Sequence, residues 1–181
     1  TDEVFEFIGR YHPLPIVSLE RDLPGCDGVI VDNDQGVKEL ITHLWVDHGY
    51  RRIGFISQVT NATAEIRQAA FEREMTSFGH LNPQLIGSIE DLYTRGIQPR
   101  IDYDALLVHA DSAAIEVVEE LERRGVRVPE DVGVVGFNDG RDARGAMPPL
   151  TTVRLPFRRM GRKGVELLAD MMSGSPHEPT V

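Results

Sequence analysis

The chain has 181 residues, of which 41% are hydrophobic and 27% are charged, and no apolar run approaches the roughly eighteen residues that a membrane span needs. This composition excludes disordered, collagenous and membrane-spanning classes and predicts one or two globular domains. The 19 basic and 29 acidic residues leave a formal charge of −10, which has the wrong sign for direct nucleic-acid binding. The single cysteine, Cys26, excludes an internal disulfide and a multi-cysteine zinc site and fits a reducing compartment.

The first eighty residues alternate short apolar runs with segments of helical period. In chain order, this pattern predicts a strand at 14–19, a strand at 28–32, a helix at 34–48, a strand at 52–57 and a helix at 66–78. By its spacing, the first helix has about four turns. We expect Asp34 to cap its start and Gly49 to end it as a C′ glycine.

The second half of the chain repeats the alternation. The elements expected there are a weak strand at 85–89, a short helix at 91–98 interrupted by Gly96, a strand at 104–109, a helix at 111–125, a strand at 132–137, a strand at 151–155 and a helix at 157–171. Asp111 is a good N-cap for its helix. Because the strands are apolar along their whole length and alternate with helices, we predict an α/β fold whose parallel sheet is covered on both faces.

Polar residues follow the predicted strands. They are residues 32–34, 57–58, 109–111 and 138–139. In an open parallel sheet, ligands bind outside the carboxyl ends of the strands, so these residues are expected to line a binding site. They can hydrogen-bond hydroxyls and amides but form no known catalytic arrangement, which favours recognition of a small polar molecule over its conversion.

Four motifs extend over roughly residues 13–173. They are VDNDQG at 31–36 with HL at 43–44 and HGYRRIGFI at 48–56, RQAAF at 67–71, GVRVPEDVGVVGF at 125–137 and PPLTTVR at 148–154. In this order they resemble the D-N-x-x-G, H-L, G-H-R-R-I, R-x-x-G-F, G-x-x-V-P-x-D-V-x-V-V-G-F and P-P-L-T-T-V-R segments of LacI/GalR-type bacterial regulators.

This resemblance implies a type I periplasmic-binding-protein-like effector domain, with two α/β lobes joined by crossing strands and the ligand between them. Residues 1–49 would form part of the N-terminal lobe, residues 50–150 the C-terminal lobe, and residues 151–181 a crossing strand and a helix that return to the N-terminal lobe. The family's helix-turn-helix, hinge helix and first two strand–helix units have no counterpart here. We therefore expect an incomplete N-terminal lobe and contact with DNA only through the missing domain.

The resemblance also implies six candidate ligand-binding residues. They are Arg67, Asn138, Asp32, Asp111, Ala110 and Tyr93. Arg67 matches an arginine that clamps hydroxyls in sugar-binding members, and its alternative is an exposed arginine or one paired with Glu65. Asn138 stands where many members have an aspartate that accepts from the ligand, and its alternative is a turn residue after a strand.

The other four candidates each have a structural alternative or a departure from the family. Ala110 replaces an asparagine that contacts the inducer in some relatives, which argues against a simple sugar ligand. Asp111 and Asp32 can instead cap helices or begin a turn. Tyr93 is a candidate for the aromatic wall on which sugars and bases stack.

The expected protein is a cytoplasmic sensing domain that dimerises in the full-length regulator and binds a small polar metabolite, such as a sugar or nucleoside. It is expected to have no enzymatic activity, cofactor or membrane partner. One alternative is a ligand-binding sensor of a signalling protein or a solute receptor for transport. A remote alternative is a small α/β enzyme that uses His109, Asp111 and Asn138.

Two apparent metal motifs are rejected, so no metal site is expected. Residues 32–34 resemble the start of a calcium loop, but Gly36 is one position early and His43 occupies the twelfth place. His43 and His48 are five residues apart, which differs from the i, i+4 pairing of helical zinc sites.

Overall fold

The computed structural model describes residues 2–11, 13–94, 96, 98 and 102–177. The chain divides into two units, one formed by Thr1–Val31 with Pro156–Val181 and the larger by Asp32–Leu155. Among the helices of these described ranges, none is both long and apolar enough to cross a membrane.

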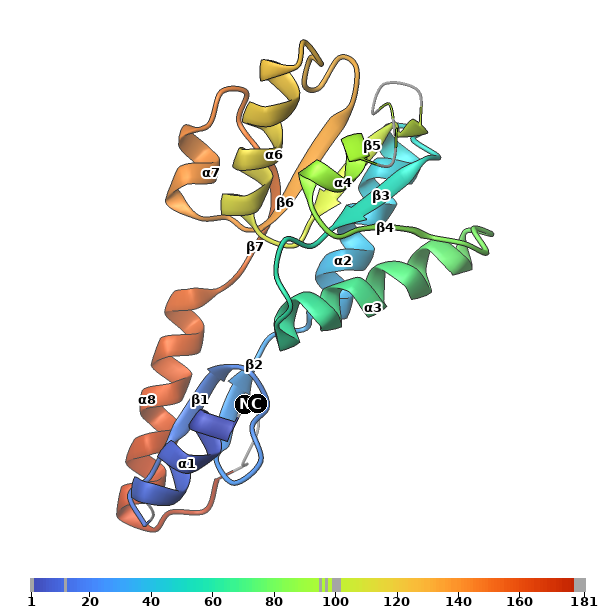
Figure 1. Ribbon diagram of the computed structural model, residues 1–181. Coiled ribbons are helices and arrows are strands. Elements are labelled where there is room, and N and C mark those ends of the chain that lie inside the picture. The colour runs from blue at the N-terminus through green and yellow to red at the C-terminus, as the bar shows by residue number, and fades with distance from the viewer. Residues whose placement is uncertain (1, 12, 95, 97, 99–101, 178–181) are drawn as a thin grey trace. The chain divides into compact units, whose positions relative to one another are not determined.

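The larger unit contains a five-stranded parallel sheet (Figure 1). Its strands are β3 (Ile53–Ile56), β4 (Gln84–Ile86), β5 (Ala105–Val108), β6 (Gly133–Asn138) and β7 (Thr151–Arg154). Their spatial order is β4-β3-β5-β6-β7, and every neighbouring pair is parallel. This sheet confirms the α/β prediction, and its parallel strands bring all their carboxyl ends to one edge.

Helices cover both faces of this sheet. They are α2 (Asn33–Thr42), α3 (Ala62–Ser77), α4 (Ile89–Thr94), α6 (Asp111–Arg123) and α7 (Arg141–Gly145). Alternate strand residues face opposite sides. Phe55 packs against Phe71 of α3 with 5.4 Å between ring centroids, whereas Ile56 belongs to the cluster that contains Leu92 of α4 and Val117 of α6. Figure 1 shows α2 and α3 on one face, with α4 and α6 on the other.

The smaller unit contains two parallel strands and two helices. These elements are α1 (Asp2–Tyr11), β1 (Val17–Glu20), β2 (Asp27–Ile30) and α8 (Phe157–Ser173). The apolar side of α8 packs on the strands and buries Met160 and Leu167 with Val29. A Cβ atom at Gly164 would lie 2.9 Å from Leu19 Cδ2, so the glycine permits the close approach of α8 to β1.

The first helix of the larger unit differs from its prediction. Asp32, and not Asp34, is the N-cap, since its side chain accepts from the Gln35 N–H at 2.8 Å. Asp34 instead pairs with Arg73 of α3. After α2 the chain forms a π-helical turn, η1 (His43–Asp47). Gly49 has a φ of +70°, which confirms that a left-handed glycine ends the helical segment.

The lobe boundaries expected at 49/50 and 150/151 stay predictions. The two compact units of the structure divide at 31/32 and 155/156. The reason is that α2 packs against α3 and β7, and β7 pairs with β6. The short helix expected at 91–98 begins earlier, at Ile89, and residues 95 and 97 lie outside the described residues. Helices α1 and α7 were not expected from the sequence.

Candidate functional site

Arg67 connects three elements at the carboxyl edge of the larger sheet. It lies in the second turn of α3, and only 2% of its surface is exposed. Its Nε donates to Asn33 Oδ1 at 2.8 Å, and its Nη1 donates to the carbonyl oxygen of His109 at 2.7 Å. Its Cζ lies 3.8 Å from the centroid of the Phe137 ring. Arg67 is therefore buried, and Asn33, His109 and Phe137 take up its donors and its planar face.

Close backbone packing allows Asn33 to reach Arg67. A Cβ atom at Gly36 would lie 2.5 Å from Phe137 Cζ, so only a glycine lets the first turn of α2 approach β6 this closely. Asn33 lies in the same first turn and is buried. A buried guanidinium is tolerated only when hydrogen bonds replace its hydration, and Asn33 supplies one of them.

Asp111 is a second buried charged group at this edge. Its Oδ2 accepts from the Gly140 N–H at 2.8 Å, and its Oδ1 accepts from the Thr152 hydroxyl at 2.5 Å. The prediction that Asp111 is an N-cap is wrong, since Ala110 occupies that position in an extended conformation without a side-chain bond. The carboxylate instead ties the start of α6 to β7 and to the turn after β6.

Asp139 continues this turn and is held by two arginines. Arg144 donates Nε to Oδ1 at 2.8 Å and Nη2 to Oδ2 at 2.7 Å, and Arg154 also donates to Oδ2. These guanidinium groups, Arg144 first, hold the pKa of the Asp139 carboxyl well below its ordinary range. Asn138 and Asp139 both have positive φ values, 119° and 54°. The ion pairs therefore hold a turn that asparagine and aspartate tolerate better than most residues.

Two buried polar atoms at this edge have no hydrogen-bond partner within the described part of the chain. They are Asn138 Oδ1 and His109 Nδ1. Their residues end or follow β6 and β5, which are neighbours in the sheet. Burial, with the positive charge of Arg67, lowers the pKa of His109, so its ring is neutral near pH 7. A neutral imidazole nitrogen and an amide oxygen can each hydrogen-bond a polar ligand.

The remaining candidates have different surroundings. Asp32 is exposed and caps α2, and Ala110 contributes no polar side-chain atom. The ring of Tyr93 lies on α4 beneath Arg124, whose Cζ is 3.7 Å from the ring centroid. Arg124 is the C-cap of α6, whose 13 residues separate it from Asp111 by about 20 Å. Tyr93 is therefore not brought together with Arg67, Asp111 and Asn138.

Three residues that contact Arg67 were not among the six candidates: Asn33, Phe137 and His109, the last of which was named only for the enzyme alternative. Asn33 lies within the polar stretch that follows the second predicted strand, so its position at a strand end was the signal for it. The sequence pattern predicts Phe137 to be an ordinary strand residue, and nothing in it indicates that the ring lies under the guanidinium of Arg67.

Comparisons with known proteins identify relatives over most of the chain. Residues 41–181 match the periplasmic binding protein-like domain family. The chain is 33% identical to the HTH-type transcriptional repressor MelR of Bacillus subtilis (strain 168) over 190 residues, which cover 96% of this chain and 55% of MelR. It is 27% identical to the repressor PurR of Aliivibrio salmonicida (strain LFI1238) over 175 residues, which cover 92% of this chain and 52% of PurR.

A solved structure supports the same relationship. It is the sugar-binding transcriptional regulator (LacI family) from Escherichia coli complexed with phosphate, with a TM-score of 0.79 and 28% identity. The match covers 99% of this chain and 68% of that one. The chain spans about half the length of the curated relatives it matches, 55% of MelR and 52% of PurR.

Proposed function

The chain belongs to the periplasmic binding protein-like domain family and matches the effector-binding domain of LacI-type repressors; from this premise we propose that it binds a small polar metabolite at the carboxyl edge of the larger sheet. The residues proposed to contact this ligand are Asn138 and His109, with Arg67 as the group that positions them. In the full-length protein, ligand binding would control the affinity of a helix-turn-helix domain for DNA.

The observation that carries this proposal is the unpartnered Oδ1 of Asn138. A buried amide oxygen without a donor is unfavourable by about 1–3 kcal/mol, so such atoms usually mark a position that water or a ligand fills. The cluster around it supports the same interpretation. Arg67 and Asp111 make hydrogen bonds to the ends of neighbouring elements, which fixes the backbone around Asn138 before any ligand arrives.

The chemistry of the edge favours a ligand rich in hydroxyl or N–H donors. Asn138 Oδ1 accepts a hydrogen bond, and the neutral His109 ring can accept or donate one according to its tautomer. Sugars and nucleosides present such groups. The E. coli regulator of similar structure is described as sugar-binding, which supports a sugar as the first class to test.

The test is a thermal-shift screen of the full-length protein against monosaccharides, disaccharides and nucleosides, followed by calorimetry of each hit. A ligand that donates to Asn138 should bind at least about tenfold more weakly to Asn138→Ala, because the variant leaves that donor unpaired. Asn138→Asp, which keeps the acceptor, should retain more of the affinity. Asn82→Ala, in an exposed turn, is the matched control and should bind as the unaltered protein does.

Equal affinities in Asn138→Ala and Asn82→Ala would contradict the proposed site. To test the coupling to DNA, the hit is titrated into the full-length protein bound to its operator. We expect the ligand to change the affinity for the operator by at least about fivefold. An unchanged operator affinity would contradict the proposed regulation of DNA binding but not the proposed binding of the ligand.

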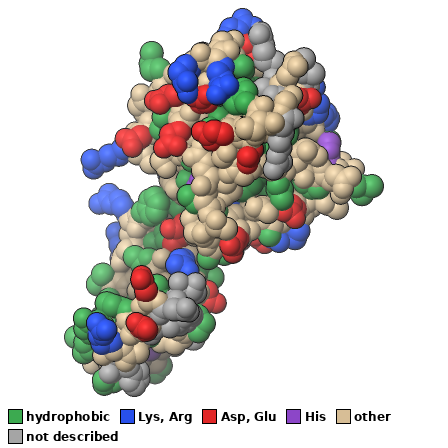
Figure 2. All heavy atoms as spheres, viewed as in Figure 1, with side chains coloured by type: hydrophobic (Ala, Val, Ile, Leu, Met, Phe, Trp, Pro, Cys, Tyr) green, Lys and Arg blue, Asp and Glu red, His purple; other side chains and the backbone are tan. Residues whose placement is uncertain are grey.

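DNA binding and dimerisation are proposed for the full-length protein. The net charge of −10 supports contact with DNA through another domain. On the face drawn in Figure 2, acidic and basic side chains of the larger unit are intermixed, which is not the pattern of a phosphate-binding surface. The MelR and PurR relatives are repressors, which supports a regulatory role in the cytoplasm over an enzymatic one.

A further inference from the structure

The π-helical turn η1 brings two histidines together at the opposite edge of the larger sheet. The sequence spacing of five residues argued against a pair, because residues i and i+4 face each other in an α-helix. In a π-helix the hydrogen bonds run from i to i+5, and the His48 N–H accordingly donates to the His43 carbonyl at 3.3 Å. The two Nε2 atoms lie 3.1 Å apart.

An acidic side chain fixes the orientation of the first ring. His43 Nδ1 lies 2.8 Å from Asp47 Oδ2. Because an ionised carboxylate can only accept, Nδ1 carries the proton and the Nε2 of a neutral His43 has a free lone pair. That lone pair is directed at His48. A histidine that donates its second ring nitrogen to a carboxylate is the usual arrangement of a metal-ligating imidazole.

The separation of the two nitrogens fits a shared metal ion. With zinc–nitrogen bonds of 2.0–2.1 Å, two ligands of a tetrahedral ion lie about 3.3 Å apart. The observed 3.1 Å is close to this value, so an ion can replace the proton between the rings with little movement of either side chain. The rings are nearly perpendicular, at 89°, so their edges do not block an approaching ion.

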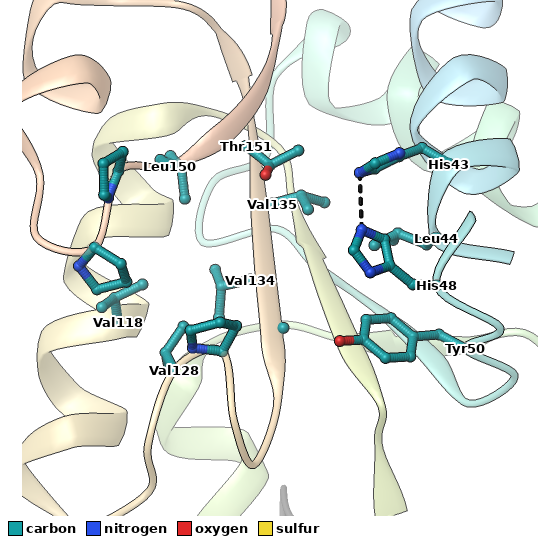
Figure 3. A pocket seen from close by; sticks show the side chains of 14 residues that line it. His43, Leu44, His48, Tyr50, Val118, Val128, Val134, Val135, Leu150 and Thr151 are labelled. Atoms are coloured by element: carbon teal, nitrogen blue, oxygen red, sulfur yellow. Dashed lines mark hydrogen bonds between the residues drawn. The ribbon is translucent and has the colours of Figure 1, made fainter. Parts of the chain in front are cut away.

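The pair lies beside a cavity of about 160 Å³ at the amino edge of the sheet. Figure 3 shows His43, His48 and Tyr50 along one wall, with Val118, Val128 and Leu150 across from them. The opposite wall is apolar and offers no ligand. Within the described ranges, no group of three or more His, Cys, Asp or Glu side chains is placed to hold a metal ion. The remaining coordination positions would therefore be filled by water.

We propose that His43 and His48 form a two-imidazole site for a divalent transition metal ion, with Asp47 as the outer carboxylate that orients His43. Imidazole ligands favour copper, nickel and zinc over magnesium and calcium. The ion would link the two ends of η1, which joins α2 to β3, and would stabilise this turn. The site is independent of the ligand proposed at the carboxyl edge.

The test uses metal ions alone on the full-length protein without an affinity tag. Calorimetry with nickel chloride and with zinc chloride should show one saturable site. His48→Ala and His43→Ala should each weaken binding at least about tenfold, and Asp47→Ala should weaken it by about tenfold through the lost outer bond. His80→Ala is the matched control, since this histidine packs on Trp45 outside the pair, and it should bind as the unaltered protein does.

A spectroscopic measurement does not depend on how the variants fold. With one equivalent of copper(II) bound to the unaltered protein, electron paramagnetic resonance should show splitting from two imidazole nitrogens. A spectrum with one or no nitrogen ligand would overturn the proposal. So would equal nickel affinity in the His43→Ala/His48→Ala double variant and in His80→Ala.

Discussion

The two edges of the larger sheet are built by different physical means. At the carboxyl edge, buried Arg67 and Asp111 and the paired Asp139 hold neighbouring elements together through hydrogen bonds of 2.5–2.8 Å. At the amino edge, Val118, Val134 and Leu150 line a cavity, and among the described residues the side-chain hydrogen bonds of His43 and His48 lie within their own turn. The amino edge also has a long-range polar contact, since Asp104 accepts from the backbone N–H groups of Arg51 and Arg52 and pairs with the Arg52 side chain. The edges differ in burial, because the guanidinium of Arg67 is buried whereas that of Arg52 is half-exposed.

This difference agrees with the two proposed sites, one for a polar ligand at the carboxyl edge and one for a metal ion at the amino edge. A site that recognises hydroxyls needs donors and acceptors held in fixed positions, and buried, mutually bonded charges provide this rigidity. Removing one partner from such a network leaves the others buried and unpaired, which is strongly destabilising. At the amino edge, the arginine that pairs with Asp104 is half-exposed, so single changes to this pair should be tolerated better.

The largest effect is expected from Arg67→Ala. The change removes the donors of Asn33 Oδ1 and the His109 carbonyl and leaves a gap beneath Phe137. We expect the free energy of unfolding to fall by about 3–5 kcal/mol. Urea denaturation followed by the fluorescence of Trp45, the single tryptophan, measures this, because Trp45 lies in the same unit.

Arg73→Ala is the control for this prediction. Arg73 lies in the same helix, but its ion pair with Asp34 is exposed on both sides, with 57% and 60% of the side chains accessible. Its removal should change the free energy of unfolding by less than about 1 kcal/mol. Similar losses for the two variants would show that Arg67 is not the centre of a buried network.

A second comparison uses two glycines of β6, Gly133 at the start of the strand and Gly136 within it. A Cβ atom at Gly136 would collide with the Asp111 carboxylate and lie 2.8 Å from Leu150 Cδ2, whereas the atom nearest to a Cβ at Gly133 would be Tyr50 Cε2, at 3.2 Å. We expect Gly136→Ala to lower the free energy of unfolding by about 2–3 kcal/mol and Gly133→Ala by about 1 kcal/mol or less. The same urea titrations measure both, and equal losses would remove the distinction between the edges.

The alternation of strands and helices was predictable because it depends on local patterns. Each central strand is a continuous apolar run. The helical segment ends at Gly49 because a glycine adopts a positive φ without strain. The polar edge was also predictable, since parallel strands end on the same side of a sheet. Asn138 and Arg67 were named on the motif, and their roles toward a ligand stay predictions.

The contacts of these residues were not predictable, because they depend on partners far away in the sequence. Asp111 resembles a cap in its local sequence, but Gly140 and Thr152 lie 29 and 41 residues further on and bind its carboxylate. The pairing of His43 with His48 was missed for a different reason. It requires a π-turn, which the apolar period of the helix does not reveal.

A smaller effect is expected from the pH dependence of the stability that Asp139 contributes at the carboxyl edge. Because Arg144 and Arg154 lower the folded-state pKa of Asp139, this group stabilises the fold fully above the ordinary carboxyl pKa of about 4, and the contribution is lost as the pH falls below it. The urea midpoint of Asp139→Asn should therefore lie below that of the unaltered protein at about pH 6, and the gap should be smaller at about pH 3, where the contribution has begun to decline toward the lowered folded-state pKa. Asp34→Asn, in the exposed pair, should show a small difference at both values, and a constant gap for Asp139→Asn would contradict the assignment.

The smallest effect is expected from His109, whose folded-state pKa is lowered by burial and by the charge of Arg67. A native state that prefers the neutral ring loses stability as the pH falls below the unfolded value of about 6.5, because unfolding then takes up a proton. Between about pH 7.5 and about pH 5, the urea midpoint of the unaltered protein should thus fall more than that of His109→Gln, which carries no titrating ring. An equal fall in both would show that the His109 ring is not held neutral at the carboxyl edge. A polar ligand that donates to Nδ1 would favour the neutral ring further, so its presence should shift the same loss of stability to lower pH.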